Sequence, residues 1–234
     1  MVSVKVWGDY ACFSRPEFKV ERVSYPIITP SAARGVLEAI YWKPAFRYQI
    51  RNIHILQQGS QIAILRNEIS ERQGAKPLRV EEKRQQRTSL ILKTVAYRID
   101  AEIALRPFAR DEIGSYLDQF NRKVRKGQCH HTPCLGTREF SAYFEQPSPK
   151  DYGHLASPTL SLDFGQMLFD IAFVETRNGA EQEMEFWRAE KAGNRRVHGF
   201  ARPLFFQAKA SHGVLPVPAE KYEELYRLEE SDAA

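Results

Sequence analysis

One stretch near the middle of the chain limits the fold more than any other. Over residues 91–105, apolar and polar side chains alternate, as in a strand with one face buried. The apolar face carries Val95, Tyr97, Ile99, Ala101, Ile103 and Leu105, and the opposite face carries Arg98, Asp100 and Glu102. The chain must therefore contain a sheet with one face against a hydrophobic core.

Five further segments have regular patterns, and their order gives the fold class. The patterns predict strands over 2–7, 46–55 and 138–144, and helices over 30–42 and 110–126. A phase slip between Ile50 and Ile53 indicates a β-bulge. The order strand, helix, strand, strand, helix, strand is that of a ferredoxin-like (RRM-like) unit. We therefore expect an α+β fold with a ferredoxin-like domain over residues 1–147.

The helix ends have clear signals. Thr29 is a predicted N-cap before Pro30 at the first helical position, and Pro44 requires that the first helix end before it. Gly127 is the predicted C-terminal glycine of the second helix.

A second domain is predicted over residues 148–234. The segment QPSPKDYGHLASP is rich in Pro, Ser and Gly and marks the boundary. The segments LDFGQMLFDIAFVETR and PLFFQAKASHGVLPVP behind it indicate a smaller β-rich domain. The acidic tail KYEELYRLEESDAA is expected to be frayed.

The composition of the chain indicates which cell compartment and which classes of binding partner to expect. The net charge of +5 permits a polyanionic partner without requiring one. No apolar run reaches the roughly 20 residues of a membrane span, and the N-terminus lacks a signal-peptide pattern. Cys12, Cys129 and Cys134 cannot form a complete disulfide framework. We therefore expect a cytoplasmic protein.

The segment RQGAKPLRVEEKRQQR, between the second and third predicted strands, has a surplus of positive charge and is expected to be mobile. It can neutralise phosphates of a nucleic acid, or it can be an ordinary solvated loop. The basic end of the second helix and the charged face Arg47 and Arg51 of the second strand could line one surface with it.

The stretch EAIYWKP ends the first helix on Tyr41, Trp42 and Lys43. Arg34, Glu38 and Tyr41 follow one another at helical spacing and predict a polar stripe. Together the end of the helix offers a hydroxyl, a stacking plane and a cation, the groups that bind RNA. The other interpretation of Trp42 is an aromatic lid on the core.

The segment CHHTPC has poor spacing for a zinc site, and no second ligand pair accompanies it. We predict no metal and no cofactor. His131 is then a phosphate contact, an acid or base, or a loop residue.

Taken together, these segments resemble the CRISPR-associated Cas-five proteins of subtype I-C, the d form, within the RAMP superfamily. The resemblance rests on VWGDYACFSRPEFKVERVSYPIITPSAARGVLEAIYWKP, RKGQCHHTPCLGTREF, PLFF and GVLPVP. It implies a ferredoxin-like domain with a β-rich extension. It also implies an endoribonuclease that cuts precursor CRISPR RNA in its repeat and keeps the 5′ handle as a subunit of a surveillance complex.

The resemblance also assigns site residues. The family's tyrosine falls on Tyr41, and its Lys-His or Lys-Tyr pair on the second helix falls on Ser115 and Tyr116, so the lysine is missing. Lys123 or Lys43 could then supply the positive charge of the missing lysine. His131 is a candidate for phosphate stabilisation or acid catalysis, with a structural role as the alternative. The predicted RNA contacts are Arg34, Lys43, Arg47, Lys123 and Arg138.

The implied chemistry is attack of a 2′-hydroxyl on the adjacent phosphate, which gives a cyclic phosphate and a 5′-hydroxyl without a metal. In that scheme Tyr41 orients or deprotonates the 2′-hydroxyl. The main alternative is a non-catalytic subunit that binds the 5′ handle. Whether duplex DNA also binds is left open.

Overall fold

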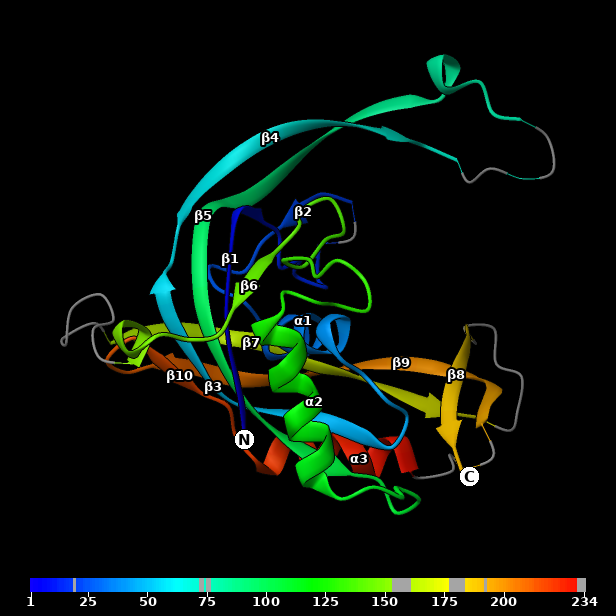
Figure 1. The fold of residues 1–234 in the computed structure, drawn as a ribbon. Helices are drawn as coiled ribbons and strands as arrows, with labels where there is room; N and C mark the ends of the chain where they lie inside the picture. The colour runs from blue at the N-terminus through cyan, green and yellow to red at the C-terminus, as the bar shows by residue number, and fades with distance from the viewer. Residues whose placement is uncertain are drawn as a thin grey trace.

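The computed structural model describes residues 1–18, 20–71, 74, 77–152, 161–176, 184–191 and 193–230. Within these residues the strands form two sheets (Figure 1). The larger sheet contains β1 (Val2–Ala11), β2 (Arg22–Val23), β3 (Phe46–Gln57), β4 (Ser60–Ile69), β5 (Arg84–Leu105), β6 (Tyr143–Glu145) and β10 (Val214–Pro216). The smaller sheet contains β7 (Leu162–Glu175), β8 (Met184–Glu190) and β9 (Gly193–Ala210).

The larger sheet has the strand order of a ferredoxin-like unit. Its path is β10-β3-β5-β1-β6, and the four strands that correspond to the predicted ones pair antiparallel. The α+β, ferredoxin-like prediction for this part of the chain is confirmed. The predicted bulge is also present, since the β3–β5 register shifts between Ile50 and Asn52.

Helices α1 (Pro30–Ile40) and α2 (Ile113–Arg125) lie against this sheet (Figure 1). The hydroxyl of Thr29 accepts the first-turn N–H of Ala32 at 3.2 Å, so the predicted N-cap is confirmed. Gly127 follows α2 at φ +60°, a conformation that favours glycine, as expected. No helix in the described ranges is long and apolar enough to cross a membrane.

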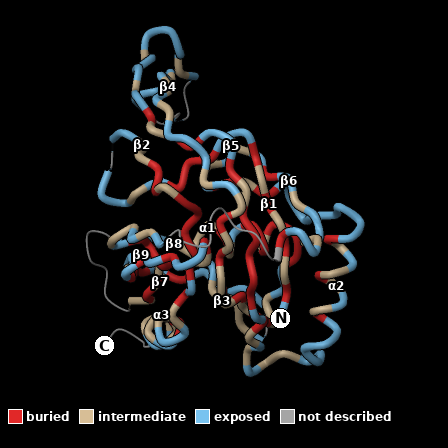
Figure 2. Tube along the Cα trace, turned by 90° about the vertical axis from the view of Figure 1, so that its left-hand side faces the viewer, coloured by how far each residue is buried: buried red, intermediate tan, exposed pale blue. Residues whose placement is uncertain are grey.

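One buried core joins the two sheets. It includes Val2, Val4 and Val6 of β1 and Phe169 and Phe206 of the smaller sheet (Figure 2). Helix α1 contacts both β3 and β7, and β10 pairs with β3. The division of the chain at residue 147 stays a prediction.

The described part of the basic segment between the strands contains regular structure as well as loop, because residues 84–87 belong to β5, and its expected mobility stays a prediction. Residues 60–69 and 84–93 pair as one hairpin, whose outer half extends from the body as an arm that carries the 3₁₀ turn η1 (Val80–Glu82) (Figure 1). Ion pairs connect the hairpin to the body and its two strands to each other. Arg66 binds Glu139 at 2.7 Å, and Arg87 lies 3.6 Å from Glu68. Arg84 and Arg87 are thus strand residues, while Arg72 and Lys76 lie outside the described residues.

Two predictions near the C-terminal half need correction. The strand expected over 138–144 is only β6, Tyr143–Glu145, followed by the 3₁₀ turn η2 (Pro149–Tyr152). The tail expected to be frayed forms helix α3 (Glu220–Glu230) up to the last four residues, which lie outside the described part. Helix α3 is held because Tyr222 and Leu225, three residues apart, are buried against the core.

Candidate functional site

Tyr41 stands at the C-terminal end of α1, where the structure differs from the predicted polar stripe. Its side chain is only 3% exposed, and its hydroxyl has no hydrogen-bond partner among the described residues. Its backbone is extended (φ −153°, ψ 122°), and its ring packs 5.7 Å from that of Phe46, centroid to centroid. The expected exposure of the phenol is therefore wrong, because the turn before Pro44 places Tyr41 inward while Trp42 is exposed.

Helix α2 brings two more groups to this point. The ring of Tyr116 lies 5.1 Å from that of Phe46, so both tyrosines pack on one phenylalanine. Lys123 is seven residues further along the same face of α2, and its Nζ lies 5.9 Å from the centroid of the Tyr41 ring. We call Tyr41, Phe46, Tyr116 and Lys123 the phenol cluster. Ser115, where the resemblance led us to expect a lysine, is exposed.

The electrostatics of the phenol cluster keep both tyrosines protonated at neutral pH. Burial raises the pKa of Tyr41, and the nearby Tyr116 and Asp111 act in the same direction, while Arg122 opposes them. Burial and the Asp111 carboxylate also raise the pKa of Tyr116. A phenol with a raised pKa is a poor general base, and it serves better as a hydrogen-bond donor or acid.

His131 lies in a loop that is fastened to the end of α1. The backbone N–H groups of His130 and His131 donate to the carbonyl of Ala39 at 2.8 and 3.2 Å. The exposed His131 lines a cavity of about 450 Å³ together with Gly35 and Glu38, and neither tyrosine of the phenol cluster lines that cavity. The structure thus brings Tyr41 and Tyr116 together, but it does not place His131 in the same cluster.

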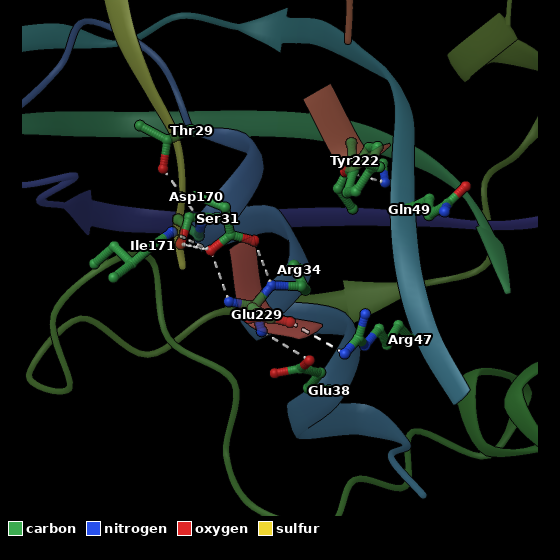
Figure 3. Close-up of polar contacts among 12 residues, drawn as sticks. Thr29, Ser31, Arg34, Glu38, Arg47, Gln49, Asp170, Ile171, Tyr222 and Glu229 are labelled. Atoms are coloured by element: carbon green, nitrogen blue, oxygen red, sulfur yellow. Dashed lines mark hydrogen bonds and ion pairs between the residues drawn. The ribbon is translucent and has the colours of Figure 1, made fainter. Parts of the chain in front are cut away.

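Arg34, a predicted RNA contact, is held by two carboxylates (Figure 3). Its Nε and Nη2 donate to the buried Asp170 of β7 at 2.7 and 2.9 Å, and its Nη1 donates to Glu38 at 2.8 Å. Burial works against the charge, but both carboxylates raise the pKa of Arg34. Arg34 therefore ties α1 to the smaller sheet, and it could contact an RNA phosphate only by exchanging these partners.

Arg47 is similarly occupied. It lies 3.1 Å from Glu229 and 3.7 Å from Glu230 of α3, and its guanidinium stacks 4.3 Å from the ring centroid of Tyr226. By contrast, Lys43 and Arg138 are exposed and form no ion pair with any described residue. The RNA contacts predicted for these residues stay predictions.

Sequence reasoning missed Asp170, Asp111 and the packed helix α3. One signal was available for Asp170: a single acid within the apolar run LFDIAF is expected to be buried and to need a cationic partner. Another was the spacing of Tyr222, Leu225 and Tyr226, which predicts one apolar helix face. In the part of the chain that the structure describes, no three His, Cys, Asp or Glu side chains gather closely enough to hold a metal ion.

The fold and the site define a ferredoxin-like α+β protein with a second antiparallel sheet and a tyrosine–lysine cluster at the end of its first helix. The model of the Cas5d family, described as "CRISPR-associated protein (Cas_Cas5)", matches residues 1–217. The chain belongs to the Cas5d family of CRISPR-associated proteins.

Two curated relatives are similar over nearly their whole length, and both are named "CRISPR pre-crRNA endoribonuclease Cas5d". The protein from Thermus thermophilus is 58% identical over 99% of this chain and 97% of its own, and that from Mannheimia succiniciproducens is 37% identical over 97% and 98%. Among solved structures, "Crystal Structure of CRISPR-associated Protein" has a TM-score of 0.61 at 20% identity and covers 94% of this chain and 92% of its own. An uncharacterized Streptococcus mutans protein, SMU1763c, also has a TM-score of 0.61, at 18% identity and the same coverage. These two structures support the fold.

Proposed function

We propose that the chain is a metal-independent endoribonuclease that cleaves precursor CRISPR RNA within the repeat. It then stays bound to the 5′ handle as a subunit of the type I-C surveillance complex. The observation that carries this proposal is the full-length similarity to the Thermus thermophilus protein, 58% identical over 99% of this chain and named a pre-crRNA endoribonuclease. As a cellular location we propose the cytoplasm, in keeping with three free cysteines.

The phenol cluster suggests how the chain's own residues act. The 2′-hydroxyl attacks the adjacent phosphate, so the site must orient that hydroxyl and stabilise charge on the phosphoryl oxygens. Because the pKa of Tyr41 is raised, we assign its phenol to hydrogen bonding with the reacting groups rather than to proton abstraction. Lys123, beside the Tyr41 ring, supplies the positive charge that Ser115 cannot. The products are a 2′,3′-cyclic phosphate and a 5′-hydroxyl.

Access to the site requires movement. A buried hydroxyl without a partner costs about 1–3 kcal/mol, which an acceptor on a bound ligand would recover. The Tyr41 hydroxyl is such a group, and because it is buried, the side chains around it must shift when RNA binds.

The second candidate function is a non-catalytic subunit that binds the 5′ handle. Two observations favour it: serine replaces the family lysine at position 115, and the Tyr41 hydroxyl is covered. In that case the same surfaces would bind RNA without cutting it.

Repeat RNA incubated with the full chain in EDTA distinguishes the two functions. A single cut with a 5′-hydroxyl on the downstream product supports the enzyme, and intact bound RNA supports the handle-binding subunit. Once the cut is mapped, a substrate with 2′-deoxyribose at the nucleotide that precedes it is the matched control. Cleavage of that substrate at the normal rate would rule out 2′-hydroxyl attack.

A further inference from the structure

A second cavity lies away from the phenol cluster, between the ends of β3 and β5, strand β8 and helix α3. It has a volume of about 510 Å³, within the roughly 300–1,000 Å³ of small-ligand sites. Its lining includes Arg47, Arg106, Phe108, Phe173, Trp187 and Tyr226. We call it the aromatic cavity.

Arg106 is the cation in this cavity that lacks a partner. Its Nε is buried without a hydrogen bond, and within the described ranges its side chain forms no ion pair. The other two arginines of the lining are neutralised, since Arg47 binds Glu229 at 3.1 Å and Arg188 binds Glu175 at 3.1 Å. Burial and the nearby Arg47 lower the pKa of Arg106, while Glu229 and Glu230, which form no ion pair with it, act in the opposite direction. An anion bound in the cavity would form an ion pair with the Arg106 guanidinium.

The rest of the lining offers flat apolar faces. Phe173 and Phe186 pack with their ring centroids 5.4 Å apart, and the neighbouring Trp187 is 65% exposed. The guanidinium of Arg196, which also pairs with Glu185 at 2.7 Å, lies 5.8 Å from the centroid of the Trp187 ring. Aromatic planes next to a free guanidinium are the combination that binds an unstacked base and its phosphate.

The aromatic cavity is also connected to the end of α1. A smaller cavity of about 120 Å³ is lined by Trp42 and Phe46, and it shares Arg47, Arg106 and Tyr226 with the aromatic cavity. The two cavities therefore adjoin each other, and the smaller one reaches Phe46 of the phenol cluster and the exposed Trp42.

We propose that the aromatic cavity seats one unpaired nucleotide of the bound RNA, with its base against Trp187 and its phosphate on Arg106. This inference rests on the proposed function only in taking RNA as the ligand, and it does not require cleavage. The exposed carboxylate of Glu230 in the lining can accept hydrogen bonds from the amino or imino groups of the base.

Binding of fluorescent repeat RNA to the full chain tests the cavity. Stacking on one aromatic residue contributes about 1–3 kcal/mol per base, so Trp187→Ala is expected to weaken binding about tenfold or more. Trp187→Phe is expected to retain most of the affinity, and Arg106→Gln to weaken it several-fold with a shallower salt dependence. Arg227→Gln removes one exposed charge of α3 outside the cavity and is the matched control, expected to bind as the wild type does. Far-ultraviolet circular dichroism verifies that each variant is folded.

Crosslinking locates the nucleotide independently. With 4-thiouridine placed at one unpaired position at a time, a single position is expected to crosslink to the peptide that contains Trp187. Wild-type affinity in both Trp187→Ala and Arg106→Gln, or crosslinks that avoid this peptide, would overturn the proposal even if the chain cuts RNA. Conversely, loss of affinity in these variants of a chain that binds but does not cut supports the cavity and refutes the nuclease. An effect on subunit assembly without an effect on RNA affinity would also overturn it.

Discussion

The polar side chains in the middle and at the end of helix α1 differ in whether they have hydrogen-bond partners. In the middle, Arg34 satisfies its guanidinium with Asp170 and Glu38 at 2.7 to 2.9 Å. At the end, Tyr41 keeps a buried hydroxyl without any partner among the described residues. Satisfied buried charges hold a fold together, whereas an unsatisfied buried group is an energetic cost that needs another explanation, such as a ligand. We therefore attribute a role in folding to Arg34, while the role of Tyr41 in RNA chemistry stays a proposal.

The largest expected effect is that of Tyr41→Phe on cleavage. If the hydroxyl acts on the reacting groups, its removal lowers the single-turnover rate by about 10²–10⁴-fold. Because the hydroxyl has no partner in the protein, the free energy of unfolding stays the same or rises. Quenched cleavage time courses and urea unfolding measure the two quantities. Tyr143→Phe, at a 60% exposed tyrosine, is the control, and a wild-type rate for Tyr41→Phe would break the assignment.

Asp170→Ala is expected to show the opposite behaviour, a large loss of stability. It leaves Arg34 partly buried beside only one carboxylate, and breaking a buried pair costs about 3–5 kcal/mol. Glu38→Ala removes the more exposed partner and is expected to cost about 1 kcal/mol or less. Urea midpoints compare the two variants. Equal losses would show that burial of Asp170 does not matter for the pair.

A second buried carboxylate with a full set of hydrogen bonds, Asp100, makes a pH-dependent contribution to stability. The buried Asp100 binds Ser3 at 2.6 Å, His54 at 2.8 Å and Arg98 at 2.8 Å. Burial opposes these hydrogen bonds, but together they lower the pKa of Asp100 from its ordinary 3.8. A lowered pKa gives stability that is present above 3.8 and lost as the pH falls through the folded value.

The corresponding variant is Asp100→Asn. It is expected to lose about 1–3 kcal/mol at pH 7 and to show a smaller further loss between pH 5 and pH 2 than the wild type. Thermal unfolding across that range is the measurement, with the exposed Asp118→Asn as the control. An acid profile in Asp100→Asn as steep as that of the wild type would contradict the assignment to Asp100.

The smallest expected effect is that of Lys123→Ala, which tests whether this lysine replaces the one missing at Ser115. We expect cleavage about tenfold slower, because one charge near the phosphate is lost, with folding little changed. Lys123→Arg should recover part of the rate. Lys150→Ala, at an exposed lysine of the turn η2, is the control. If the Lys123→Ala variant cuts as fast as the Lys150→Ala control, another residue supplies the positive charge near the phosphate.

Local patterns predicted the elements of the larger sheet well. The alternation in β5, the cap at Thr29 and the bulge in β3 are properties of neighbouring residues, so they could be read along the chain. The hairpin arm was missed because its basic outer half has the composition of a solvated loop. Its pairing becomes evident only when residues 60–69 meet residues 84–93.

The sequence by itself determined the order of the four predicted strands and two helices of the ferredoxin-like unit, the cap at Thr29, the glycine after α2, and, through long motifs, the family. It also brought Tyr41 and Tyr116 forward as a pair. Only the tertiary structure decided that the Tyr41 phenol is buried, that Lys123 lies on its ring, and that Arg34 binds an aspartate 136 residues away. Periodicity reports which face of an element is buried, but the partner that covers this face depends on how distant segments pack together.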